Sequence, residues 1–86
     1  MKVLFYGNVR EYTDGGESFD AGNVECVRSL VDLLGDRFGA PFREFLLGDD
    51  TCFFLVNGNA IMATGGLATP LCPDDTVDVL PFVDGC

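Results

Sequence analysis

The chain has 86 residues, with 14 acidic and 5 basic side chains and a formal net charge of −9. A chain of this length predicts one domain with little room for a catalytic cleft beside its own core, which argues against an enzyme that acts alone. The negative charge repels phosphate backbones and anionic membranes, so nucleic acid and membranes are not expected partners; docking on a basic protein surface and simple solubility explain it equally well.

The opening of the chain predicts two strands that pair as a hairpin. Residues 1–6 form an apolar run with β-branched and aromatic side chains, which is typical of a strand. Residues 13–16 are turn formers, and the short charged segment 17–20 that follows can pair back as a second strand at the edge of the sheet.

A single amphipathic helix is predicted over residues 24–38, where apolar side chains recur at helical spacing. Asn23 is the expected N-cap, and Glu25 would place negative charge in the first turn. Gly35 lies inside this helix at a cost of about 1 kcal/mol relative to alanine, which indicates either a close approach of another element or an early C-cap.

The second half of the chain predicts a short helix and the remaining strands. Residues 41–47 begin with proline and read as a helix that Gly48 closes. Residues 52–56 carry the strongest strand signal, and Asn57-Gly58 predicts a tight turn into a short returning strand at residues 60–62. The last strand is expected over residues 77–82.

This order of elements describes an α+β domain in which a mixed sheet of four to five strands packs one face on one main helix. The arrangement is the ubiquitin-like β-grasp. We expect it to form a single domain over residues 1–86, with a flexible C-terminal tail at residues 83–86.

Alternation along the predicted strands divides their side chains between two faces. An open face that carries many large apolar groups indicates a partner-binding surface. A register displaced by one residue, which would exchange the faces, or loops that cover the face are the alternatives. The residues expected to face the helix are Val3, Phe5, Phe54, Val56, Val77 and Val79. The residues expected on the partner-binding face are Leu4, Tyr6, Phe53, Leu55, Leu80 and Phe82.

Neither a membrane segment nor a secretory signal is predicted. The longest uncharged, apolar-rich stretch, residues 51–72, is interrupted by turn formers at 57–59 and 65–66, and the apolar run after Lys2 ends by Asn8. We therefore expect a cytoplasmic protein with reduced thiols.

The reactive side chains form no familiar catalytic or metal-binding set. The sequence has no histidine, and the spacing of its four cysteines matches no zinc or iron–sulfur motif, so no metal site is predicted. The aspartate pairs at 49–50 and 74–75 are expected to cap turns. Cys26 and Cys52 lie in apolar patterns and are expected in the core, whereas packing gives no reason for Cys86. The protein is therefore expected to take part in chemistry as a substrate or carrier.

Three segments resemble the MoaD/ThiS family of ubiquitin-like sulfur carriers. They are residues 1–11 (MKVLFYGNVRE), residues 55–58 (LVNG) and above all residues 74–85 (DDTVDVLPFVDG). The similarity covers essentially the whole chain, and it is greater to the small subunit of molybdopterin synthase than to the shorter carriers of the thiamine pathway.

The resemblance implies a function in molybdopterin or tungstopterin cofactor biosynthesis. A MoeB/ThiF-like adenylating enzyme would activate the C-terminal carboxylate with ATP, and sulfur would then replace the adenylate to give a thiocarboxylate. The thiocarboxylate would donate its sulfur within a complex with the MoaE-like large subunit of molybdopterin synthase. The chain itself would bind no cofactor and would act as the carrier subunit of a sulfurtransferase.

The family pattern ends in Gly-Gly, whereas this sequence ends in Asp84-Gly85-Cys86. Gly85 and Cys86 are therefore the candidate catalytic residues, in one of two ways: a tail-trimming protease removes Cys86 and exposes the Gly85 carboxylate, or the partners accept Cys86 as the end. The alternative is a non-catalytic ubiquitin-like interaction module that keeps only the docking surface. A redox role for Cys86 is disfavoured because the many acids raise a thiol pKa.

Overall fold

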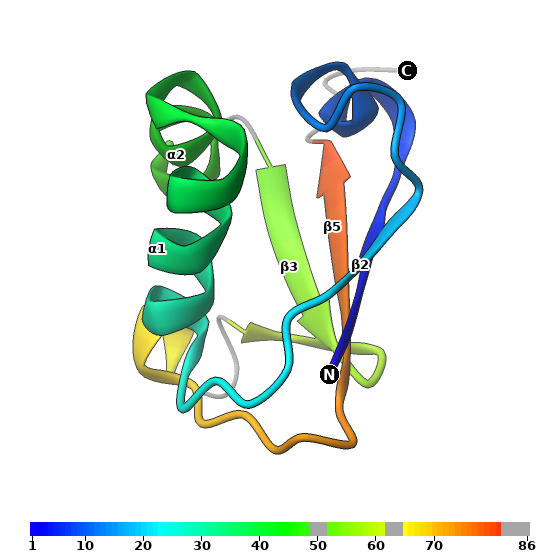
Figure 1. The fold of residues 1–86 in the computed structure, drawn as a ribbon. Coiled ribbons are helices and arrows are strands. Elements are labelled where there is room, and N and C mark those ends of the chain that lie inside the picture. Colours follow the sequence, from blue (N-terminus) through cyan, green and yellow to red (C-terminus); the bar gives the residue numbers. More distant parts are fainter. Residues whose placement is uncertain (49–51, 62–64, 82–86) are drawn as a thin grey trace.

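The computed structural model describes residues 1–48, 52–61 and 65–81. Within them, a mixed sheet of five strands in the order β2-β1-β5-β3-β4 packs one face on the helices α1 (Val27–Phe38) and α2 (Ala40–Leu47) (Figure 1). Only the central pair, β1 and β5, is parallel among the pairings of these strands. The strands are β1 (Lys2–Phe5), β2 (Ser18–Asp20), β3 (Cys52–Val56), β4 (Asn59–Ala60) and β5 (Thr76–Pro81). The predicted α+β architecture is therefore confirmed.

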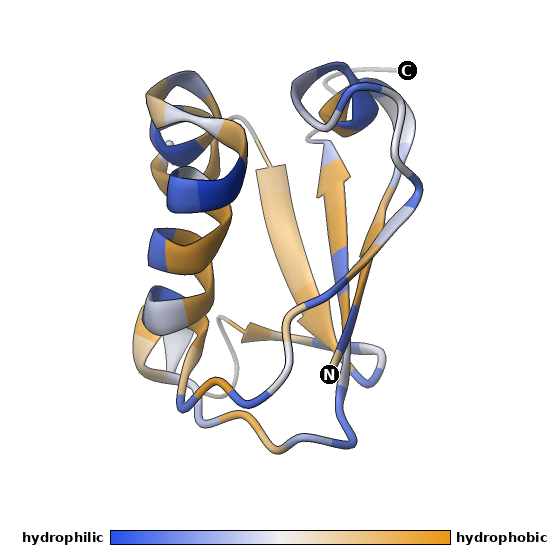
Figure 2. Ribbon diagram, in the orientation of Figure 1, coloured by the Kyte–Doolittle hydropathy of each residue, from blue (hydrophilic) through white to orange (hydrophobic). Residues whose placement is uncertain are grey.

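The core lies between the sheet and the helices and contains buried apolar residues of both layers. Figure 2 shows that the strands β3 and β5 and the side of α1 nearer to the sheet are largely hydrophobic. The central strands contribute Val3, Phe5, Val77 and Val79, all of them at most 1% exposed. Because these residues alternate with exposed or half-buried ones, the predicted division of the strands into two faces is confirmed, with Val56 only partly buried at the edge of the core. The opposing residues of α1 are Val27, Leu30, Val31 and Leu34.

The expected N-terminus of the main helix is wrong. The helix begins at Val27, so Asn23 does not cap it and Glu25 is not in its first turn. The Val27 N–H donates to the carbonyl of Thr69 (3.1 Å), and the Leu71 N–H donates to the carbonyl of Glu25 (2.9 Å). These contacts pair the segment before α1 with a distant part of the chain, and this pairing replaces the first helical turn that local capping signals favour.

The later start of α1 also changes the place of Cys26. Cys26 is the N-cap residue and is half-buried, so the prediction that it is a core residue is wrong. Its Sγ lies 3.5 Å from the Ser29 hydroxyl, and this hydrogen bond lowers the pKa of the Cys26 thiol. Cys52, by contrast, is buried as predicted.

Gly35 marks the close approach of the two helices, one of the two roles expected for it. A Cβ at Gly35 would lie 2.8 Å from the Cβ of Arg43 on α2, so a side chain does not fit without a shift. The Arg43 guanidinium reaches back to Asp32 on α1, with 2.6 Å between Nη2 and Oδ1. The second helix covers the predicted range with one more residue at its start, and Gly48 is its C-cap residue.

An aromatic cluster joins α2 to a short 3₁₀ helix, η1 (Gly7–Tyr12), which the sequence patterns did not predict. Tyr12 stacks on Phe42 and Phe45 with ring centroids 5.4 and 4.7 Å apart. Phe42 in turn packs edge-on against Phe5 of β1 at 5.9 Å. These contacts hold η1 at the end of the sheet where β5 finishes. Another 3₁₀ helix, η3 (Gly66–Ala68), precedes β5.

The predicted tight turn at Asn57-Gly58 is present, with positive φ angles of 52° and 86°. It leads into β4 at Asn59–Ala60; Met62, the end of the predicted returning strand, lies outside the described residues. The Asp75 carboxylate accepts hydrogen bonds from the backbone N–H of Cys72 and from the side-chain amide of Asn57, both at 2.8 Å. The two bonds link this turn to the one before β5 and lower the pKa of Asp75.

No helix in the described part of the chain is long and apolar enough to cross a membrane.

We expect Asp75→Asn to lower the free energy of unfolding at pH 7. The free energy of unfolding of the variant should also fall less as the pH is lowered. A carboxyl whose pKa is lower in the folded chain stabilises it above the unfolded pKa of about 3.9, and this stabilisation is lost as the pH falls through the folded value. The difference between wild type and variant should therefore shrink between pH 7 and pH values well below the ordinary aspartate pKa. Urea denaturation at several pH values measures it.

The matched control is Asp74→Asn, a change at the exposed neighbouring residue that should alter the unfolding free energy by less than about 0.5 kcal/mol. Equal effects of the two substitutions at every pH would contradict a role of Asp75 in linking the turns.

Candidate functional site

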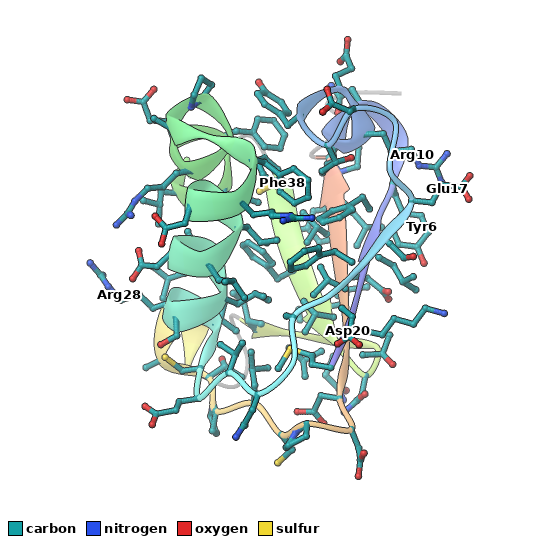
Figure 3. The ribbon with its side chains drawn as sticks, viewed as in Figure 1. Tyr6, Arg10, Glu17, Asp20, Arg28 and Phe38 are labelled. Atoms are coloured by element: carbon teal, nitrogen blue, oxygen red, sulfur yellow. The ribbon has the colours of Figure 1, made fainter. Side chains whose placement is uncertain are left out.

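The face of the sheet away from the helices carries all the predicted partner-binding residues that the structure describes. Tyr6 and Phe53 are the most accessible, at 37% and 39% exposed, and the others are half-buried. Figure 3 shows Tyr6 on the side of the sheet away from α1. We call this surface the open face, and it consists of Leu4, Tyr6, Phe53, Leu55 and Leu80. Its predicted role in binding stays a prediction, and Phe82 lies outside the described residues.

The strand register orders the open face into rows. Phe53 of β3 is paired with Leu80 of β5. The Tyr6 N–H donates to the carbonyl of Val79 at 3.1 Å, which places Tyr6 beside Leu80 on the other side of β5. This row of large apolar side chains crosses the sheet near the end of β5, the strand that residues 82–86 follow in the sequence. The predicted catalytic residues Gly85 and Cys86 belong to that segment and lie outside the described residues.

The end of β5 at Pro81 is held by η1. Gly7 has a φ of 57°, and a Cβ there would lie 2.9 Å from the Cγ of Pro81, the last residue of β5. Figure 1 shows η1 beside the end of the β5 arrow. Arg10 fixes η1 by donating from Nε to the carbonyl of Phe5 at 3.0 Å, and its Nη1 lies 3.6 Å from the Glu17 carboxylate. The strand-breaking Gly7 is the one sequence signal that could have located this contact.

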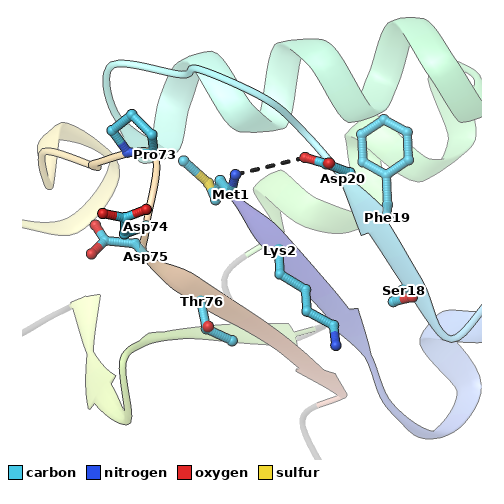
Figure 4. Close-up of a pocket in the computed structure, with 9 residues that line it drawn as sticks. All are labelled: Met1, Lys2, Ser18, Phe19, Asp20, Pro73, Asp74, Asp75 and Thr76. Carbon is cyan, nitrogen blue, oxygen red and sulfur yellow. Dashed lines mark ion pairs between the residues drawn. The ribbon is translucent and has the colours of Figure 1, made fainter.

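A pocket of about 390 Å³ lies at the opposite end of β1 and β5 (Figure 4). There the N-terminal ammonium is 3.6 Å from the Asp20 carboxylate. The pKa of Asp20 is lowered first by the hydrogen bond from the Gly22 N–H and then by the charge of the ammonium. Because β5 separates this pocket from Pro81 by roughly 17 Å of strand, it is not part of the site at the C-terminal segment. It is lined by Met1, Lys2, Ser18, Phe19, Asp20, Pro73, Asp74, Asp75 and Thr76.

Acidic and thiol side chains do not converge on a metal site: among residues 1–48, 52–61 and 65–81, no group of three or more could hold an ion. The Asp75 carboxylate is engaged by its turn, as expected for a cap, while the pair at 49–50 lies outside the described residues.

The mixed sheet with its parallel central pair, one face covered by helices and the other open, defines a ubiquitin-like β-grasp protein. The sequence model of the ThiS family matches residues 3–85. The chain therefore belongs to the ThiS family, a family of ubiquitin-like sulfur carriers, and the resemblance found in the sequence is confirmed. No curated protein matched the chain.

Solved structures of the same fold align over nearly the whole chain. CysO in the Amycolatopsis orientalis BexX/CysO complex has a TM-score of 0.81 and 22% identity, covering 99% of this chain and 98% of that one. The small archaeal modifier protein 1 of Methanosarcina acetivorans has a TM-score of 0.77 and 28% identity, covering 99% and 94%. A putative molybdopterin converting factor subunit 1 from Pyrococcus furiosus has a TM-score of 0.72 and 23% identity, covering 95% of each chain.

We expect Gly7→Ala to destabilise the protein more than Gly22→Ala. Both residues have positive φ angles, of 57° and 70°, so each alanine costs about 1–2 kcal/mol of backbone strain. Only at Gly7 does the added methyl group also overlap Pro81, whereas nothing lies within 4 Å at Gly22; the overlap adds about 1–3 kcal/mol. Chemical denaturation of the two variants measures the difference.

The contact itself is tested by adding Pro81→Ala to the Gly7→Ala variant, since this removes the ring atom that the methyl group meets. The second substitution should recover part of the lost stability. If Gly7→Ala costs no more than Gly22→Ala, η1 does not hold the end of β5 in the way described.

Proposed function

We propose that this protein is a sulfur carrier of molybdopterin or tungstopterin cofactor biosynthesis, whose C-terminal segment is adenylated and then thiocarboxylated. The observation that carries the proposal is the extent of the family match, which runs through β5 and the segment after it to Gly85. The similarity to the converting factor subunit of Pyrococcus furiosus supports the choice of sulfur acceptor. A cytoplasmic location, where thiols stay reduced, belongs to the same proposal.

In this proposal the activated group is the carboxylate of Gly85. Cys86 lies beyond the matched residues, so its removal by a protease would leave the chain ending where the family pattern ends. A carboxylate oxygen then attacks the α-phosphorus of ATP and releases pyrophosphate. Hydrosulfide from the sulfur donor next attacks the acyl carbon and releases AMP, and loss of the S–H proton leaves a thiocarboxylate. The adenylating enzyme binds the ATP, and this chain binds no cofactor.

The open face is the proposed docking surface for the MoeB/ThiF-like adenylating enzyme and, afterwards, for the MoaE-like large subunit. Its apolar row of Tyr6, Leu80 and Phe53 lies near the end of β5, and the segment that has to enter the partner's active site follows this strand in the sequence. A closed active site around that segment would keep water from the acyl adenylate. The complex of CysO with BexX supports docking as the way in which such a domain works.

Intact-mass spectrometry tests the proposal on the protein purified from its host and on the chain ending at Gly85. Each is incubated with the host's adenylating enzyme, ATP and a sulfur donor. We expect the host protein to lack the mass of one cysteine residue, and the shortened chain to gain the mass difference between sulfur and oxygen. An untrimmed chain that gains sulfur would instead make Cys86 the acyl-bearing residue.

The carrier proposal would be overturned if the host protein kept Cys86 and if neither the host protein nor the chain ending at Gly85 gained sulfur. The replacement of the first family glycine by Asp84 and the presence of Cys86 would then favour a non-catalytic interaction module. In that case the open face would still bind a partner, but no ATP would be consumed.

Docking is tested by Phe53→Asp, which places a charge in the apolar row of the open face. We expect binding to the adenylating enzyme to weaken by about thirtyfold or more, with the fold retained because Phe53 is already 39% exposed. The matched control is Leu47→Asp, which changes an apolar residue 43% exposed on α2. Calorimetric titration measures both affinities, and equal losses for the two variants would exclude the open face as the docking surface.

A further inference from the structure

The centre of the open face holds a carboxylate. Asp78 of β5 is paired with Leu4 of β1 on one side and with Leu55 of β3 on the other, so it stands between two leucines on the same face. Asp78 is half-buried. A partner that covers the neighbouring apolar row therefore also covers, or closely borders, this carboxylate.

Within the described residues, Asp78 has little compensation for its charge. The Tyr6 hydroxyl donates to its Oδ1 at a long 3.4 Å. None of the ion pairs in this part of the chain involves Asp78. Lys2 lies on the same face, but it is paired with Thr76, two residues before Asp78 on β5. In the free protein, water is therefore the main partner of this carboxylate.

Docking removes that water, and an unpaired buried carboxylate opposes binding strongly. A partner avoids this penalty only by supplying a positively charged donor at the same position. An arginine suits the position because its planar guanidinium donates two parallel hydrogen bonds to a carboxylate. The formal net charge of −9 also favours approach to a basic surface.

We infer that Asp78 is a specificity residue of the open face, which selects a partner that places an arginine or lysine side chain between Leu4 and Leu55. The inference rests on the proposed function, because the partner meant is the adenylating enzyme. Asp78 is not a catalytic residue: five residues of β5 and the C-terminal segment, 79–83, separate it from Asp84-Gly85. It acts on docking.

The test measures binding of the full chain to the host's adenylating enzyme at low and high salt. Asp78→Asn should weaken binding by about tenfold and Asp78→Lys by about a hundredfold, and both should reduce the salt dependence. Asp36→Lys makes the same charge change at an exposed residue of α1, on the other side of the sheet, and should alter binding by less than about threefold. Thermal unfolding confirms that each variant is folded.

Three further variants separate the inference from simpler explanations. Asp78→Leu extends the apolar surface, so tighter binding of this variant would overturn the inference, whereas a loss would support it because the partner's cation is left unpaired. Tyr6→Phe removes the hydrogen bond at 3.4 Å, and an equal loss from it would make Asp78 only a support for Tyr6. A loss from Lys2→Gln as large as that from Asp78→Asn would mean that Lys2, not the partner, pairs with Asp78.

Adenylation kinetics add a readout that a purely structural role would not give. Because Asp78 acts on docking, Asp78→Asn should raise the KM for the carrier and leave kcat unchanged. Unchanged KM and affinity for the Asp78 variants, with wild type adenylated normally, would overturn this inference alone. Absence of adenylation in the wild-type chain ending at Gly85 would overturn the proposed function and this inference together.

Discussion

The parallel pairing of β1 with β5 is the contact on which the rest of this structure depends. It joins residues near the two ends of the chain, with Val3 beside Val77 and Phe5 beside Val79, and these four side chains are almost completely buried. The same pairing fixes which side chains point the other way. The open face, the place of Asp78 within it and the position of the end of β5 at Pro81 therefore all follow from one register.

The strands and the division of their faces could be predicted from the sequence because both depend on local alternation. Val77 and Val79 alternate with Asp78 and Leu80 in the sequence itself. A period of two residues divides the side chains into two sets, and only the choice of the set that faces the helices is then undetermined. Gly35 could also be interpreted correctly, since a glycine within a helical pattern needs a reason such as its contact with Arg43. These features need no knowledge of distant contacts.

The features that were missed depend on contacts between distant segments. The start of α1 is displaced because Val27 and Glu25 bond to residues around Pro70, and no capping rule contains that partner. The helix η1 depends on the stacking of Tyr12 on α2. The pocket around Lys2 is built from three separate segments. Of the candidate site, the sequence predicted the apolar face, but the isolation of Asp78 between two leucines became clear only with the register.

The position of β5 also has a consequence for folding during synthesis on the ribosome. The strand at the middle of the sheet, β5, follows all the other strands in the sequence, so it is synthesised after them and long after its partner β1. Contacts between such distant residues are slow to form, because a long loop has to close before they stabilise anything. The core therefore cannot close until β5 has emerged. The strand that completes the core is directly followed by the C-terminal segment, so a chain that displays a finished open face is one whose synthesis has reached that segment.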